Sequence, residues 1–163
     1  MSTPLDAIRK TDGSSKHVIA LRVLAGAPLL FFGIMHFVNP SMPMKPLLEE
    51  AGLPAPALMA ILAPLAQVAA GVLLLSGAFA RVGGVMAIGT MIGALVTHVL
   101  IANDSWPTRQ EDGSMAPGEE PVVMMAIAAA VILASLYVLW RGSGAFGLDA
   151  KSSTESPAAP QPA

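Results

Sequence analysis

Residues 17–38 read HVIALRVLAGAPLLFFGIMHFV, an apolar run in which Arg22 is the only residue with a permanent charge. A helix of about 20 residues is long enough to cross the ~30 Å hydrocarbon core of a membrane. The run is too long for the apolar part of a signal peptide, and no small-residue cleavage pattern follows it. It therefore predicts an uncleaved first membrane span.

Three further apolar runs follow, at residues 55–79, 82–102 and 121–140. Inside a bilayer the backbone must form its hydrogen bonds within the protein, and the short alternating strands of a barrel are missing from the sequence. We therefore expect an all-α protein, an integral membrane four-helix bundle over residues 17–141. A polar segment, residues 1–16, precedes the bundle. Residues 142–163 begin rich in glycine and end in SSTESPAAPQPA, a composition typical of a disordered tail.

The composition of the chain supports this class. Of the 163 residues, 54% are hydrophobic and 12% are charged, whereas soluble domains carry about 25% charged residues. The formal net charge of -2 leaves no basic face for nucleic acid. Because the chain holds no cysteine, disulfides, thiolate metal sites and thiol–quinone exchange are excluded.

The basic residues predict the orientation of the bundle in the membrane. One side carries most of them: Arg9, Lys10, Lys16, Arg81, Arg141 and Lys151. The other side has only Lys45 and Arg109. The positive-inside rule therefore places both termini in the cytoplasm and the two longer loops outside.

Four polar side chains enter the predicted spans, namely Arg22, His36, Gln67 and His98. An ionisable group inside a membrane is a functional hypothesis by default. The helical period places each of the four on a face shared with small residues, so each is expected to point into the bundle.

The two histidines are expected at similar depth. His36 comes three residues before Asn39 and His98 five before Asn103, which places both about 5–8 Å below the outer boundary. We expect a shared ligand-binding pocket in the outer half of the bundle. Gln67 forms its floor in this hypothesis, and Asn39, Asn103 and Asp104 form its roof.

Such a pocket could hold a quinone carbonyl by a hydrogen bond or relay protons, because imidazole titrates near neutral pH. The alternative is that each histidine only bonds a nearby carbonyl. A metal is not expected, since two histidines leave a zinc site two ligands short. Axial ligation of a b-type haem stays open as a weaker alternative. No catalytic residue is assigned, and enzymatic activity is left open.

Two further features carry expectations. Arg22 lies about one turn inside the cytoplasmic edge, so its side chain is expected to reach lipid phosphate or a partner protein. Pro28 and Pro64 each free a carbonyl one turn earlier and bend their helices. These bends either open a cleft or only shape the packing.

Three stretches carry a family resemblance: LRVLAGAPLLFFGIMHFVNP (21–40), GLPAP (52–56) and QVAAGVLLLSGAFARVGG (67–84). They resemble the DoxX family of small four-helix bacterial membrane proteins, and the similarity covers about residues 18–102. Gln67 departs from the acidic residue of many relatives, which argues against proton transfer at that position.

The resemblance implies a multi-pass protein of the bacterial inner membrane. The family is linked to thiosulfate:quinone oxidoreduction and to the maturation of redox enzymes. The expected function is therefore that of an accessory subunit of a quinone-linked redox system, with a redox enzyme as partner. The alternatives are a non-catalytic scaffold or assembly partner and a haem-binding membrane subunit. The oligomeric state is left open.

Overall fold

The computed structural model describes residues 8–9, 11, 15–40, 42–101, 108–109, 115–116 and 121–150. Its four long helices are α2 (Val18–Val38), α4 (Pro56–Ser76), α5 (Ala80–Leu100) and α6 (Pro121–Arg141). Each contains 21 residues, a length of about 30 Å. All four supply a segment long and apolar enough to cross a membrane. The predicted all-α, four-helix membrane fold is confirmed.

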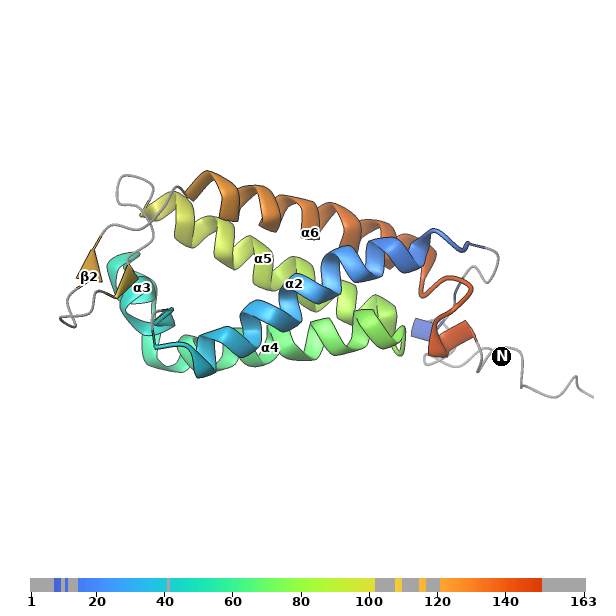
Figure 1. The fold of residues 1–163 in the computed structure, drawn as a ribbon, viewed down its shortest axis with the longest axis horizontal. Coiled ribbons are helices and arrows are strands. Elements are labelled where there is room, and N and C mark those ends of the chain that lie inside the picture. Colours follow the sequence, from blue (N-terminus) through green and yellow to red (C-terminus); the bar gives the residue numbers. More distant parts are fainter. Residues whose placement is uncertain are drawn as a thin grey trace, which may run out of the picture.

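Shorter elements join the long helices at one end of the bundle. The helix α3 (Met44–Glu50) follows α2. The strands β1 (Thr108–Arg109) and β2 (Met115–Ala116) form an antiparallel pair between α5 and α6. All three lie at the end of the bundle opposite to residues 8–9 and 142–150 (Figure 1). We call these two ends the α3 end and the terminal end.

The four long helices form a ring in which each packs on two others. Helix α2 packs on α4 and α6, and α5 packs on the same two helices. Helices α2 and α5 therefore occupy opposite corners of the bundle. Figure 1 shows that α2 runs obliquely, lying beside α6 at the terminal end and beside α4 at the α3 end.

Glycines bring α2 and α4 into close contact. A Cβ atom on Gly71 would lie 2.8 Å from the backbone nitrogen of Leu30 and 2.9 Å from the carbonyl oxygen of Gly26. A Cβ atom on Gly33 would lie 3.0 Å from the carbonyl oxygen of Pro64. Small residues allow helix backbones to approach closely in a membrane. The backbones of α2 and α4 therefore lie in close contact along the faces that carry these glycines.

The apolar side chains are distributed as in a membrane protein. The core is built largely from small and medium residues, including Val18, Ala25, Leu29, Ala70, Leu74 and Val131. Many other large apolar side chains point outward, among them Phe31 at 56% and Leu133 at 69% exposure. Exposed side chains of this kind find their apolar surroundings in lipid.

Residues 142–150 differ from the sequence-based expectation of disorder. Gly142 and Gly144 adopt left-handed conformations, with φ of 77° and 71°, which turn the chain back beneath the bundle. Ser143 and Asp149 are then almost fully buried, at 1% and 3% exposure. The ordered part of the chain therefore extends beyond α6.

Candidate functional site

Arg22 is enclosed by backbone carbonyl groups at the terminal end. Its Nε and Nη2 atoms donate to the carbonyl oxygens of Leu74 and Leu75, both at 2.6 Å. Its Nη1 atom donates to the carbonyl oxygen of Ser143 at 3.0 Å. The carbonyl groups at the end of a helix lack partners within that helix. Arg22 therefore caps the C-terminal end of α4.

Arg22 was expected to reach lipid phosphate or a partner protein, whereas its side chain is only 2% exposed and points inward to these carbonyl groups. Distance along the span predicted its depth but not its direction. The side chain turns inward because carbonyl groups of α4 lie within hydrogen-bonding distance there. Gly77 leaves the space that this arrangement needs, since a Cβ atom on it would lie 2.6 Å from the Nη2 atom of Arg22.

Asp149 caps the neighbouring helix end. Its Oδ1 atom accepts the backbone N–H of Phe79 at 3.0 Å, and its Oδ2 atom accepts that of Ala80 at 3.1 Å. A carboxylate at the start of a helix satisfies unpaired N–H groups and faces the positive end of the helix dipole. Asp149 also attracts Arg22 electrostatically. The two residues thus connect α2, α4, α5 and the segment after α6.

Sequence analysis missed the role of Asp149, although a signal was present. The stretch 142–150 reads GSGAFGLDA. Its glycines suit tight turns. Phe146 and Leu148 are untypical of a disordered segment, which contains few apolar residues.

His36 lies at the α3 end of α2 and is half-buried. Its Nδ1 atom is 3.3 Å from the carbonyl oxygen of Met42. Asn39 ends the helix, and its carbonyl oxygen accepts the Met42 N–H at 3.1 Å. The turn from α2 into α3 therefore positions the imidazole ring. This contact is of the kind expected in the alternative to a ligand pocket, in which each histidine only bonds a nearby carbonyl.

His98 and Gln67 are both buried, at 4% and 5% exposure. His98 lies one turn before Ile101, which packs with Leu47 of α3 and with Ala51 directly after that helix. Gln67 lies near the middle of α4, and its Oε1 atom has no hydrogen-bond partner among the residues that the structure describes. A buried acceptor of this kind is uncommon in proteins.

The shared pocket of His36, Gln67 and His98 stays a prediction. The three side chains come from three helices, and the two histidines stand on α2 and α5 at opposite corners of the bundle. Asn103 and Asp104 lie outside the described residues. Within the described part of the chain, no group of three or more His, Cys, Asp or Glu side chains could hold a metal ion.

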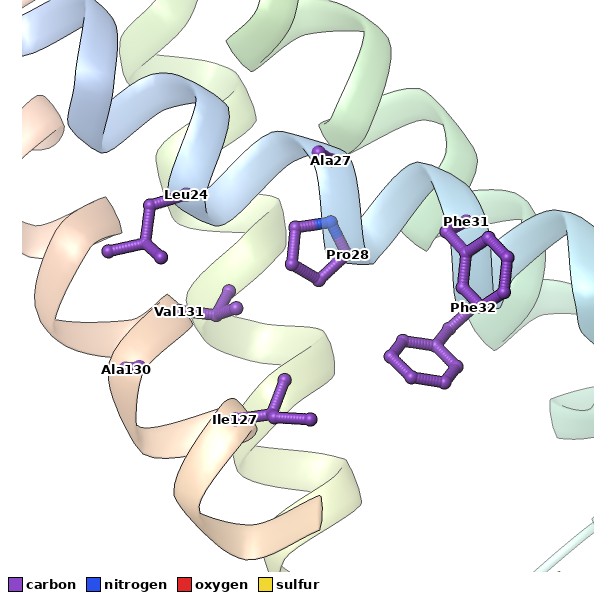
Figure 2. Close-up of a pocket in the computed structure, with 8 residues that line it drawn as sticks. All are labelled: Leu24, Ala27, Pro28, Phe31, Phe32, Ile127, Ala130 and Val131. Atoms are coloured by element: carbon purple, nitrogen blue, oxygen red, sulfur yellow. The ribbon is translucent and has the colours of Figure 1, made fainter. Parts of the chain in front are cut away.

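An apolar cleft lies between α2 and α6, about halfway along both helices, with a volume of about 420 Å³. It is lined by Leu24, Ala27, Pro28, Phe31, Phe32, Ile127, Ala130 and Val131. Figure 2 shows Pro28 and Phe32 of α2 facing α6 across the cleft. Because Leu24 and Phe31 are 51% and 56% exposed, the cleft borders the outer surface of the bundle.

The oblique course of α2 accounts for this cleft. At the terminal end α2 and α6 are close, since the Nε2 atom of His17 lies 2.6 Å from the hydroxyl oxygen of Tyr137. Toward the α3 end the glycine contacts hold α2 against α4, so α2 moves away from α6 (Figure 1). Pro28 lines the resulting space.

Four apolar helices with their polar side chains turned inward define an integral membrane protein. The family model DoxX matches residues 17–99. The chain is also 32% identical over 145 residues to the uncharacterized membrane protein Rv3486 of Mycobacterium tuberculosis. The aligned region covers 86% of this chain and 84% of that protein. The chain therefore belongs to the DoxX family. No solved structure matches it.

Proposed function

We propose that this protein is an accessory subunit of a quinone-linked redox system in the bacterial inner membrane. In this proposal it holds the isoprenoid tail of a quinone in the cleft between α2 and α6. The observation that carries the proposal is the cleft itself, which is lined by apolar side chains only and has a volume of about 420 Å³. Ligand pockets in proteins have volumes of about 300–1,000 Å³.

The position of His36 supports a place for the quinone head group. Pro28 and Phe32 line the cleft at a spacing of four residues along α2, and His36 follows four residues later. Residues four apart lie on the same side of a helix, about 6 Å along its axis. A tail in the cleft would therefore lead toward the imidazole of His36, which can hydrogen-bond a quinone carbonyl.

The proposed role is binding and not electron transfer by the chain itself. Without cysteine the chain cannot undergo disulfide exchange, so the redox step would belong to the quinone and to a partner enzyme. The basic residues of the terminal end favour an orientation with that end in the cytoplasm. The cleft would then face the bilayer, and His36 would stand toward the outer leaflet.

Quinone binding to the purified protein in nanodiscs tests the proposal. Decylubiquinone and a long-chain menaquinone are the probes, and Ala130→Trp is the variant that fills the cleft. Ala129→Trp is the matched control, since Ala129 is exposed on α6 and does not line the cleft. We expect Ala130→Trp to weaken binding at least tenfold and Ala129→Trp to leave it unchanged. His36→Ala should weaken binding of both probes, because both carry the quinone head.

Two outcomes would contradict the proposal. One is a parent protein that binds neither probe. The other is equal binding by Ala130→Trp and Ala129→Trp. Co-purification of one stoichiometric protein partner without any bound quinone would instead favour the scaffold alternative.

A further inference from the structure

We propose that the terminal end carries a binding site for the headgroup of an anionic phospholipid, formed by Arg81 and Arg141 around Trp140. The site is separate from the quinone cleft and does not depend on the proposed function. It follows from the geometry, the charge and the apolar surface at the ends of α5 and α6.

Two guanidinium groups contact Trp140, one at its backbone carbonyl group and one at its indole ring. The Nη2 atom of Arg81, in the first turn of α5, donates to the carbonyl oxygen of Trp140 at 3.2 Å. The guanidinium carbon of Arg141 lies 5.4 Å from the centre of the Trp140 ring. Arg141 is also anchored through its Nη2 atom, which donates to the Oγ atom of Ser15 at 2.7 Å. Both positive charges are therefore held at the same residue, Trp140.

The exposed charge at this end is positive throughout the described residues. Lys16 is exposed, and Arg9 stacks on the ring of Phe79 at 4.4 Å. Asp149 is the only carboxylate that the described segments place at this end, and it is buried at the start of α5. A phosphate group is the natural complement, since guanidinium groups bind phosphate oxygens by paired, charge-assisted hydrogen bonds.

The apolar surface next to the arginines indicates a lipid and not a soluble phosphate. Trp140 is 68% exposed, as expected for a tryptophan at the membrane interface. Leu136 and Leu133 follow one and two turns back along the same side of α6, at 47% and 69% exposure. An acyl chain can lie along the two leucines while its phosphate meets the two guanidinium groups. A soluble anion would leave this apolar surface without a partner.

Fluorescence quenching of Trp140 by brominated lipids tests the site. The chain holds two tryptophans, so Trp106→Phe makes Trp140 the only reporter. The protein is placed in phosphatidylcholine vesicles with one fifth phosphatidylglycerol, and either lipid carries bromine on its acyl chains. We expect the site to bind phosphatidylglycerol about five-fold more tightly than phosphatidylcholine, as about one basic contact at a membrane surface would give.

Variants separate a charge effect from a structural one. Arg81→Gln/Arg141→Gln should reduce the preference to the statistical ratio, whereas Arg81→Lys/Arg141→Lys should keep most of it. Lys45→Gln, at the α3 end, should leave it unchanged. If the double glutamine variant does not fold, the two single variants carry the test, and each should reduce the preference.

Three results would overturn the proposal. The first is equal quenching by the two brominated lipids in the parent. The second is a preference that survives loss of both arginine charges. The third is a preference removed by about 10 mM inorganic phosphate, a concentration that adds little ionic strength. Such a loss would indicate a site for the free anion.

Discussion

Replacing Asp149 by alanine should lower the free energy of unfolding by about 3 kcal/mol. The carboxylate accepts two backbone N–H groups of α5, at 3.0 and 3.1 Å. A hydrogen bond to a charged group contributes about 1.5 kcal/mol or more, so the pair gives about 3 kcal/mol. Solvent screens this site little because Asp149 is only 3% exposed.

The change also affects the neighbouring backbone and Arg22. Phe79 has a left-handed conformation, with φ of 48°, which is unfavourable for a residue with a side chain. The carboxylate bond to its N–H stabilises this conformation. Arg22, buried at 2% exposure, would lose its electrostatic attraction to Asp149.

Reversible unfolding by sodium dodecyl sulfate in mixed micelles, followed by far-ultraviolet circular dichroism, measures the effect. Asp149→Asn keeps one acceptor oxygen and should lose about half of the stabilisation. Glu50→Ala is the control, because Glu50 is an exposed acid at the α3 end, and it should change stability by less than about 0.5 kcal/mol.

A double-mutant cycle between Asp149→Asn and Arg22→Met isolates the attraction between the two side chains. The two losses should be non-additive by about 1 kcal/mol, since each change removes part of one shared network. If Asp149→Ala stays within about 0.5 kcal/mol of the parent, residues 142–150 do not stabilise the bundle and the reasoning fails.

The same assay checks four further substitutions. Gly77→Ala should lose about 2 kcal/mol or more, because the residue has φ of 67° and the new Cβ atom would lie 2.6 Å from Arg22. Gly89→Ala should instead gain up to about 1 kcal/mol, since nothing lies within 4 Å of its added Cβ atom in mid-helix; a loss there would show that the helix face is covered. Gly71→Ala should lose about 1–3 kcal/mol by forcing α2 away from α4, and an unchanged free energy of unfolding would contradict that. Gln67→Leu should be neutral or stabilising because it removes a buried acceptor without a described partner; a clear loss would reveal a bound water.

The four helices could be predicted from sequence because each span depends on a local property. An apolar run of about 20 residues has few structures open to it in lipid. The small residues that share a helix face with the polar side chains likewise predict a close helix contact. Gly77 ends α4 in the left-handed conformation, with φ of 67°, that glycine commonly adopts after a helix.

The cap formed by Asp149 could not be predicted in the same way. Its carboxylate and the N–H of Phe79 are 70 residues apart in the chain, and no local pattern links two such positions. Arg22 illustrates a related limit. Its depth follows from its position in the span, whereas its inward direction depends on carbonyl groups of α4, more than fifty residues away.

The cleft depends on the angle between α2 and α6, which also lies beyond local sequence patterns. Pro28 predicted a bend in α2 and left open whether that bend opens a cleft or only shapes the packing. The cleft itself follows from the oblique course of α2 (Figure 1). The similar depth of His36 and His98 stays a prediction from their spacing to the loops. That their helices α2 and α5 stand at opposite corners of the bundle could not be predicted, because it depends on which helices pack on each other.

The two ends of the bundle are held together by different kinds of interaction. At the terminal end, Arg22 and Asp149 tie the helix ends together through five hydrogen bonds to the backbone. At the α3 end, the described contacts of α3 with Ile101 are apolar packing, which has no fixed direction. The two ends are therefore held by different interactions, directed hydrogen bonds at the terminal end and apolar packing at the α3 end. The charged residue inside the membrane thus serves the architecture, while the cleft of the proposed quinone site lies among apolar side chains.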